Sequence, residues 1–309
     1  FDAYQAKDAP SVKDTLINIF PSNPIQAMAD GKMLQVIVFA LLLGLALSRA
    51  GDAGSRIAGF FQDLNEVMMK LITMVIQLTP YGVFCLMVKL GATVGWVEIG
   101  KVLAYFLTVA SALILHGLLV YPTLLRILAG VNPLTFLRKM REPMLVAFST
   151  SSSGATLPVT LRTVEHRIGV NNNVASFAVP LGATINMDGT AIMQGVATVF
   201  IAQFFGYQLG VDALLMVILT ATLASIGTAA VPGVGLITLT LVLGQVGLPI
   251  EGIGLIIGVD RLLDMLRTVV NVTGDGTVAT IVANSEGQLD KETLRDPNAG
   301  AVAQVPSDT

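Results

Sequence analysis

Residues 211–249 read VDALLMVILTATLASIGTAAVPGVGLITLTLVLGQVGLP, two apolar runs joined by a tip of Ser, Gly, Ala and Pro. They belong to a longer stretch, 168–259, that contains no Lys or Arg and only three acidic residues, Asp188, Asp212 and Glu251. We expect a stretch so poor in charge to lie mostly at membrane depth. Non-helical backbone is tolerated there only where protein or water surrounds it. The pattern therefore predicts a re-entrant helical hairpin with its tip at 225–235.

The composition of the whole chain supports a membrane protein. Of its 309 residues, 53% are hydrophobic and 13% are charged, with a mean hydropathy of +0.74. Soluble domains carry about 25% charged residues, so a water-soluble globule is excluded. Apolar stretches of helical length also exclude a barrel of short alternating strands. The single cysteine, Cys85, excludes an internal disulfide and a thiolate metal cluster. The fold class predicted is an all-α polytopic protein of the cell (inner) membrane.

Breaks in the apolar pattern divide the chain. A Ser/Thr-rich stretch at 149–158 lies between basic clusters and predicts the tip of another re-entrant hairpin. Because basic residues gather at 49–56, 126–141 and 162–167, we expect that side to be cytoplasmic. The segments expected are an extracellular polar segment at 1–29, spanning helices at 30–97 with a kink at Pro80, a helix at 98–130, the first hairpin at 131–167, a helix at 168–210 broken near 182–189, the second hairpin at 211–250, a last helix at 251–284, and a cytoplasmic tail at 285–309 that is disordered from about Glu286.

The last predicted helix carries Asp260, Asp264, Arg267, Asn271 and Asp275 at spacings of four, three, four and four. At about 100° per residue, these side chains fall within roughly an 80° arc and form one polar stripe. A charge at mid-membrane costs about 2.5 to 3.5 kcal/mol, so four exposed to lipid would cost about 10 to 14 kcal/mol. The stripe must therefore face protein, water or ligand.

The charge of this stripe indicates a missing cation. Its three aspartates and one arginine sum to −2, and Asp188, in NMDGT at 186–190, makes the sum −3 if it approaches the same site. Only Arg261, off the stripe, is available as a further balance. Carboxylates and the carbonyls of a broken helix are hard oxygen donors, which favour a hard cation. The prediction is bound Na⁺; protons on the carboxylates are the competing account.

The same stripe suggests a substrate. Arg267 is suited to bind a carboxylate through its guanidinium fork, and Asp264, nearly one turn away, can receive an ammonium group. Ser152 and Ser153, with main-chain amides at the hairpin tip, can accept a second carboxylate. Together these groups describe an acidic α-amino acid. Two purely structural interpretations stay open: an ion pair between Arg267 and Asp264, and a Ser run that only forms hydrogen bonds between helices.

Several motifs occur in order: STSSSGATLP at 149–158, NMDGT at 186–190, GTAAVPG at 227–233 and DMLRTVVNVTGD at 264–275. From about Asp30 to Asn284 the chain resembles the dicarboxylate/amino-acid:cation symporters, the family of excitatory amino-acid transporter homologues. The resemblance implies a homotrimer in which an outer scaffold, here 30–97, holds a core that moves like an elevator. The match starts at the family's fourth helix, so we expect the first three to be absent.

The resemblance also implies roles for individual residues. Arg267 matches the residue that binds the side-chain carboxylate of the substrate, and Asp264 the residue that binds its amino group. Further substrate contacts implied are Ser153, Thr190, Val231, Gly235, Thr268 and Asn271. The implied sodium ligands are Gly182, Asn186, Asn271 and Asp275 in one site, Thr184, Met187, Ser225, Ile226 and Thr228 in a second, and Asp188 with Asn186 in a third.

Specificity follows from the same comparison. Neutral amino-acid members lack the arginine and C4-dicarboxylate members lack the aspartate, so Arg267 with Asp264 favours aspartate or glutamate. Gln194 stands where animal members place a glutamate linked to proton coupling. The accessory arginine of the family is replaced by Ser151 and Met265, and Arg261 lies one turn before Met265.

The function predicted is therefore sodium-coupled symport of aspartate or glutamate, not catalysis. The alternatives are a proton-coupled glutamate or C4-dicarboxylate symporter, an intramembrane protease and a passive anion channel. A protease is disfavoured because Asp275 lacks a glycine at Val272, and Ser153 lacks one at Ser151 and has no evident histidine partner.

Overall fold

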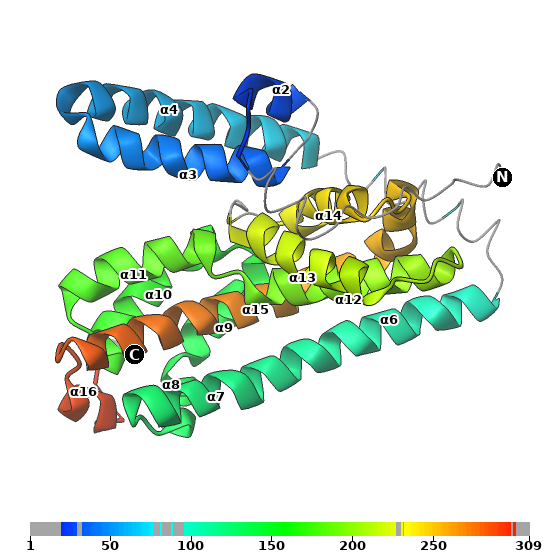
Figure 1. The fold of residues 1–309 in the computed structure, drawn as a ribbon. Helices are drawn as coiled ribbons and strands as arrows, with labels where there is room; N and C mark the ends of the chain where they lie inside the picture. Colours follow the sequence, from blue (N-terminus) through cyan, green and yellow to red (C-terminus); the bar gives the residue numbers. More distant parts are fainter. Residues whose placement is uncertain are drawn as a thin grey trace.

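The computed structural model describes residues 20–29, 33–76, 81, 88, 96–226, 230, 232–297 and 299–300. Within these residues the regular elements are helices, apart from one isolated bridge between Val170 and Leu289. Figure 1 shows long helices packed side by side around α15, with the pair α3 and α4 beside them. The predicted all-α class is confirmed for this part of the chain. The elements are α2 (Pro24–Ala29), α3 (Met33–Arg49), α4 (Gly51–Ile76), α6 (Trp96–Leu115), η1 (His116–Val120), α7 (Tyr121–Leu124), η2 (Leu125–Ala129), α8 (Pro133–Lys139), α9 (Arg141–Thr150), α10 (Ser153–Arg162), η3 (Thr163–Ile168), α11 (Asn172–Ile185), α12 (Asp188–Phe204), α13 (Val211–Ile226), α14 (Val234–Gln245), η4 (Ile250–Gly252), α15 (Ile253–Ser285) and α16 (Lys291–Arg295).

The turn between α3 and α4 is tight. Helix α3 ends at Arg49 and α4 begins at Gly51, where the backbone has φ +57°. A Cβ on Gly54 would lie 1.9 Å from the carbonyl oxygen of Leu47, so the reversal depends on glycine. The predicted kink at Pro80 and the cysteine Cys85 lie outside the described residues.

One described helix is long and apolar enough to cross a membrane. It runs over Gly100–Ala129 for 30 residues, in agreement with the helix expected at 98–130. Pro122 lies in this run without ending it, because the π-helical turns η1 and η2 flank the short α-helix α7. Local π-helical turns can provide other hydrogen-bond donors for the carbonyl group that a proline leaves without an N–H partner.

The first hairpin has a narrower tip than expected. Its chain reverses at Ser151, the one described non-glycine residue with positive φ (52°), and α10 starts at Ser153. Pro158 therefore lies inside α10 and not in the tip. The second hairpin pairs α13 with α14, and Gly233, with φ +75°, precedes α14. Of its tip, residues 227–229 and 231 lie outside the described part.

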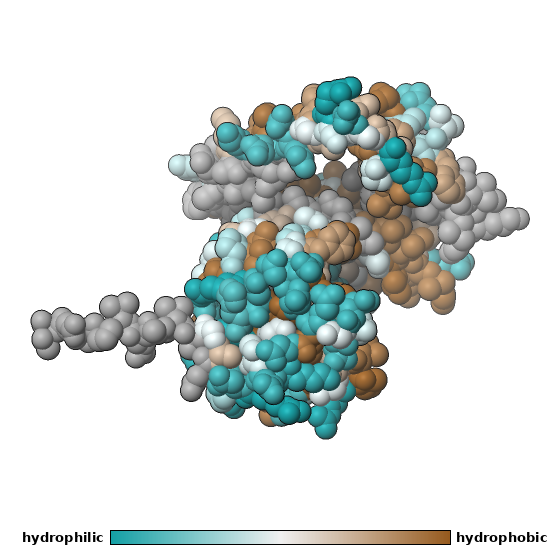
Figure 2. All heavy atoms as spheres, turned by 90° about the vertical axis from the view of Figure 1, so that its left-hand side faces the viewer, coloured by the Kyte–Doolittle hydropathy of each residue, from teal (hydrophilic) through white to brown (hydrophobic). Residues whose placement is uncertain are grey.

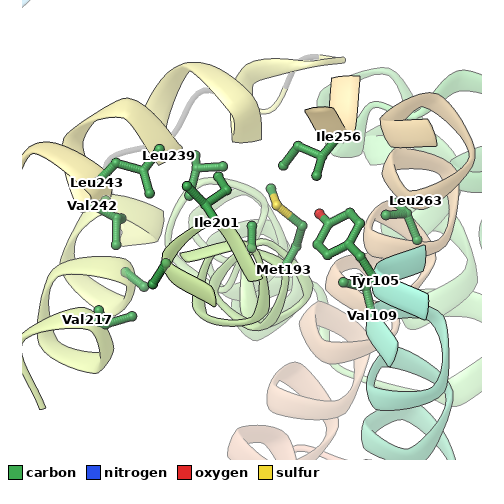
Figure 3. Close-up of a cluster of buried hydrophobic side chains, with 14 of the residues drawn as sticks. Tyr105, Val109, Met193, Ile201, Val217, Leu239, Val242, Leu243, Ile256 and Leu263 are labelled. Carbon is green, nitrogen blue, oxygen red and sulfur yellow. The ribbon is translucent and has the colours of Figure 1, made fainter. Parts of the chain in front are cut away.

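Helix α15 lies at the centre of the fold and contacts α6, α9, α11 and α12. The predicted break in the preceding helix is confirmed and is short: α11 ends at Ile185 and α12 begins at Asp188. One apolar cluster joins α6, α12, α14 and α15 through Tyr105, Met193, Leu239 and Leu263, among others (Figure 3). A second cluster lies around Phe136, Met140 and Ala279, beneath the first hairpin. Together they hold α15 against the hairpins.

The tail prediction is wrong for residues 286–297, which fold back and form α16. Asp290 caps this helix by accepting hydrogen bonds from the amides of Glu292 and Thr293, at 2.9 and 3.3 Å. The Thr293 hydroxyl donates to the same carboxylate at 2.7 Å, and these bonds hold the pKa of Asp290 below its usual value. Leu294 is buried in the second cluster. A single buried leucine leaves no apolar run in the sequence, so the helix was missed.

Burial in the second cluster predicts a difference between neighbouring residues of α8. Phe136 is fully buried, whereas Leu134 is 72% exposed. We expect Phe136→Ala to lower the free energy of unfolding by about 3 to 5 kcal/mol, because it leaves a cavity. The control, Leu134→Ala, should change it by less than about 0.5 kcal/mol. The thermal midpoints of the purified variants in detergent measure this, and equal midpoints would contradict the assignment of this core.

Candidate substrate and cation site

Both hairpins, the broken helix and α15 meet at one small cavity. Its lining residues are Ser151, Ser153, Met187, Thr190, Ala230, Val234, Gly235, Asp264, Arg267, Thr268 and Asn271. Most of the substrate contacts implied by the resemblance are among them. Val231 lies outside the described residues, and Ser152 is not part of the lining.

The serines at 151–153 have different contacts from those predicted. The Ser152 hydroxyl accepts from the Ala155 amide at 3.1 Å, as the cap of α10, and donates to the Ala230 carbonyl at 2.7 Å. Ser152 therefore joins the tips of the two hairpins. Ser151, missed as a site residue, lines the cavity instead, and its buried hydroxyl finds no partner among the described residues. The chain reverses at Ser151 in the left-handed conformation, and the cavity is lined by Ser151 in place of Ser152.

Arg267 is 1% exposed and lies between two carboxylates. Its Nη2 donates to Asp264 Oδ1 at 2.6 Å, and its Nη1 donates to Asp260 Oδ1 at 3.1 Å. The sequence placed Asp260 on the polar stripe but gave it no role. Gly235 makes room for the guanidinium, because a Cβ there would lie 2.9 Å from Nη1. The ion pair considered from the spacing is therefore formed, inside the cavity.

Asp264 connects the guanidinium to the second hairpin. Its Oδ2 accepts from the Gly233 amide at 2.9 Å, while Oδ1 receives Arg267. Arg261 Nη1 lies 4.0 Å from the same Oδ2, and the Arg261 side chain is 56% exposed. Asp264 is thus held by a hairpin amide and a buried arginine, with a second arginine at the surface.

A second polar region lies where α11 and α12 break. Asn186 Nδ2 donates to Asp275 Oδ1 at 3.2 Å, and a Cβ on Gly182 would lie 2.6 Å from the same oxygen. This close approach brings the α11 backbone to the Asp275 carboxylate. No Lys or Arg among the described residues pairs with Asp275. Asp275 is 2% exposed, and the donor that the described residues bring to its carboxylate is the amide of Asn186.

Asp188 has partners that sequence reasoning missed. Its Oδ2 accepts from the Tyr121 hydroxyl at 3.0 Å and lies 3.2 Å from His116 Nε2. His116 lies in the apolar run Gly100–Ala129 and finds in Asp188 a partner for its ring nitrogen. Tyr121 carried no signal, since one tyrosine in an apolar helix is unremarkable by pattern.

Only part of the second implied sodium site, which contains Thr184, Ser225 and Thr228, lies among the described residues. The hydroxyls of Thr184 and Ser225 each donate within their own helix, to the carbonyls of Leu181 and Thr222. Thr228 lies outside the described residues, and Ile226 ends α13. In the part of the chain that is described, no three His, Cys, Asp or Glu side chains gather as a metal centre. The donors available are carbonyl, amide and single carboxylate oxygens, which suit a hard cation.

The start of α12 approaches α15 closely. The Gly189 amide donates to Asn271 Oδ1 at 2.8 Å, and Asn271 Nδ2 lies 3.5 Å from Thr190 Oγ1. A Cβ on Gly189 would lie 2.8 Å from the carbonyl oxygen of Arg267. Glycine thus allows the broken helix to reach the backbone beside the buried arginine.

Comparison with known proteins agrees with this geometry. The sequence profile of the sodium:dicarboxylate symporter family matches residues 1–285. The chain belongs to this family. It is 42% identical over 261 residues to an excitatory amino acid transporter of Caenorhabditis elegans, covering 84% of the chain and 52% of the relative. It is 42% identical to human excitatory amino acid transporter 2, covering 84% and 46%, and 40% identical to mouse excitatory amino acid transporter 5, covering 86% and 48%.

The chain therefore spans about half the length of the curated relatives that it matches. The resemblance drawn from the four motifs is confirmed, and the family consists of membrane transporters rather than enzymes. The alternative of an intramembrane protease is set aside.

The contact between α12 and α15 yields a matched pair of substitutions. Gly189→Ala places a methyl group against the α15 backbone, and we expect a loss of about 1 to 3 kcal/mol in stability. On the same helix, a Cβ on Gly195 meets nothing within 4 Å. Gly195→Ala should stabilise α12 by about 0.5 to 1 kcal/mol. Thermal midpoints compare the two variants, and a neutral Gly189→Ala would mean that this approach is not tight.

Proposed function

We propose that this chain forms the transport core of a multi-pass, sodium-coupled symporter for an acidic amino acid, aspartate or glutamate. The single observation that carries the proposal is the buried Arg267 between Asp260 and Asp264, in a cavity formed by two hairpin tips and a broken helix. Membership of the family and the names of its relatives support the same substrate class.

An incoming substrate would exchange partners with the protein. Its side-chain carboxylate can take the Nη2 of Arg267, which now binds Asp264 at 2.6 Å. Asp264 is then released to receive the ammonium group of the substrate, while Asp260 keeps Nη1 in place. Since a carboxylate binds a guanidinium through two parallel hydrogen bonds, this exchange favours a substrate that carries both groups. The α-carboxylate would face Ser151 and Ser153 at the first hairpin tip.

Charge balance supports coupling to a cation. Asp260, Asp264 and Arg267 together carry −1, and an acidic amino acid adds another −1 to the cavity. Asp275 on α15 and Asp188 at the start of α12 lie near the break between α11 and α12, without a Lys or Arg partner among the described residues. In a low-dielectric site, this negative charge is costly unless cations enter with the substrate. Sodium is therefore cargo that makes substrate binding favourable.

The proposed cation ligands follow the geometry. Gly182, Asn186, Asn271 and Asp275 would hold one ion, and Asp188 with Asn186 and the Tyr121 hydroxyl would contribute to another. For a further ion, the family pattern supports Thr184, Met187, Ser225, Ile226 and Thr228. The first two sets lie at the break between α11 and α12 and on the facing part of α15, whereas the third set rests on the family pattern.

Movement is proposed to follow the elevator scheme of the family, within a homotrimer. The tips of the two hairpins are joined through one carbonyl: Ser152 Oγ donates to Ala230 O at 2.7 Å, and the Gly154 amide donates to it at 3.2 Å. This contact joins the two hairpin tips beside the cavity, and its opening would admit or release the substrate.

Proton coupling is the second candidate. Buried Gln194 donates from Nε2 to Thr238 Oγ1 at 2.7 Å, and an amide cannot carry a proton in the manner of a glutamate. A C4-dicarboxylate substrate would leave Asp264 without an ammonium partner. A passive anion channel would not need coupled cations at all. These features favour the sodium-coupled amino-acid symporter.

Arg267→Cys tests the substrate site. We expect it to abolish aspartate binding, with a loss of at least about 2 to 5 kcal/mol, because the guanidinium fork is removed and two buried aspartates lose their partner. Arg261→Cys removes the same charge from the exposed position beside Asp264 and should change affinity little. Calorimetric titration of the folded proteins with aspartate and with serine measures both. Unchanged aspartate affinity in Arg267→Cys would remove this residue from the site.

Replacing sodium tests the coupling. Aspartate binding should weaken sharply when choline or potassium replaces sodium, because the carboxylates near the broken helix are then uncompensated. Asp188→Asn should flatten the dependence of aspartate affinity on sodium concentration, whereas Asp212→Asn, at an exposed position of α13, should not. Binding that ignores sodium but strengthens at low pH would instead favour proton coupling.

A further inference from the structure

Lys139, at the end of α8, is buried away from the substrate cavity. The residue is 2% exposed, and its Nζ donates to three main-chain carbonyls: Arg167 O at 2.6 Å, Thr293 O at 2.7 Å and Asp296 O at 2.8 Å. An ammonium group has three donors, so these bonds use its full capacity. Burying such a group is costly unless it is paired in this way. Its position therefore depends on the segments that supply the carbonyls.

The three carbonyls come from two different segments. Arg167 lies in η3, which ends the first hairpin, and Lys139 itself ends the helix that begins the hairpin. We call these two ends, Pro133–Lys139 and Thr163–Ile168, the feet of the hairpin. Thr293 and Asp296 belong to the tail, at the carboxyl end of α16, where exposed carbonyls favour a cation. One ammonium group thus joins both feet to the tail.

Backbone pairing fixes the same tail segment independently. The Asn171 amide donates to Gln288 O at 3.0 Å, and the Asp290 amide donates to Gly169 O at 2.8 Å, on either side of the Val170–Leu289 bridge. Gly169 has φ +87°, and a Cβ there would lie 2.5 Å from Asp290 O. Residues 288–296 therefore form a clamp, which we name the tail clamp.

The tail clamp and the substrate cavity lie at opposite ends of one hairpin. Helices α9 and α10 pack against each other, and each has ten residues, or about 15 Å of helix. They carry Ser151 and Ser153 at the tip and continue into the feet at the base. Figure 1 shows α16 beside α8 at the end of the molecule that Figure 2 presents, and this end is largely hydrophilic.

We propose that Lys139 is a positioning residue for the substrate site: through the tail clamp it holds the feet of the first hairpin together and thereby fixes Ser151 and Ser153 at its tip. When the feet separate, the packed pair α9 and α10 can splay, and the tip loses its alignment with Ala230. The tail is thus part of the machinery that preorganises the cavity. The link to affinity rests on the proposed function, whereas the link to hairpin motion does not.

The first experiment measures motion with nitroxide labels in the full-length protein, in a Cys85→Ser background. One label replaces Glu292 on α16 and another, in a separate protein, replaces the exposed Ser149 near the tip. Lys139→Met should raise the mobility of both labels, because it removes the three bonds but keeps the length of the side chain. Lys291→Met, at an exposed lysine of α16, should change neither. Lys139→Arg should keep the charge and restore most of the order.

A second experiment tests rescue. Val170, two residues after the second foot, and Leu289 form a non-hydrogen-bonded pair of the antiparallel bridge, the kind in which side chains lie closest. A cysteine pair there can form a disulfide that ties the tail to the end of that foot. In Lys139→Met, aspartate affinity in sodium should fall several-fold. The Val170→Cys/Leu289→Cys disulfide should restore it, and reductant should remove the restoration. If Lys139→Met does not fold, Leu294→Ala, which removes the buried anchor of α16, serves in its place.

The outcomes separate the two proposals. Mobility that rises at position 292 but not at 149 would overturn the inference, since the tail would then only cover the base of the hairpin. Unchanged mobility at both positions would overturn it as well. If the unmodified protein fails to bind aspartate, the proposed function fails, while the two labels still decide whether the tail clamp controls the tip.

Discussion

Charge buried on a central helix is the constraint on which the structure depends. Helix α15 places Asp260, Asp264, Arg267 and Asp275 at 7% exposure or less, where an uncompensated charge is costly. Arg267 compensates two of the aspartates. The remaining compensation comes from amides and hydroxyls of neighbouring segments, or from what the site binds. The rest of the fold can be understood as the means of bringing those groups to α15.

Interrupted helices bring polar backbone groups to α15. A continuous helix has no free backbone amides or carbonyls in its middle, so it cannot offer them to a buried side chain. The breaks at Asn186–Met187 and Ser151–Ser152 expose such groups in the interior, and so do Ala230 and Gly233 of the second hairpin. Gly233 donates its amide to Asp264, and Gly189 donates its amide to Asn271. Glycine at 182, 189 and 235 also allows the approach, because a Cβ at each would lie within 3 Å of α15 atoms.

Sequence reasoning found what periodicity and composition encode. The stripe on α15 and the break near Asp188 follow from spacing and from residue type, and both are present. What it missed depends on contacts between distant segments. Asp260 is one of several stripe residues until the structure turns it toward Arg267, and the exchange between Ser151 and Ser152 depends on one left-handed residue. Neither Tyr121 nor the tail helix α16 has a periodic pattern in the sequence. Tyr121 is a single side chain bonded to Asp188, and α16 is held by one buried leucine and by the backbone bonds before it.

Lys139 and Arg267, the two buried basic side chains among the described residues, behave differently because their partners differ. Arg267 is paired with carboxylates, one of which a substrate can replace without leaving a charge alone, since the substrate brings both a carboxylate and an ammonium group. Lys139 is paired with three backbone carbonyls, and no soluble ligand replaces a helix end. Under the proposed function, exchangeable pairing belongs on α15 beside the cavity, and permanent pairing belongs at the base of the first hairpin. Fixed bonds at that base can keep the hairpin folded while the groups around Arg267 exchange partners.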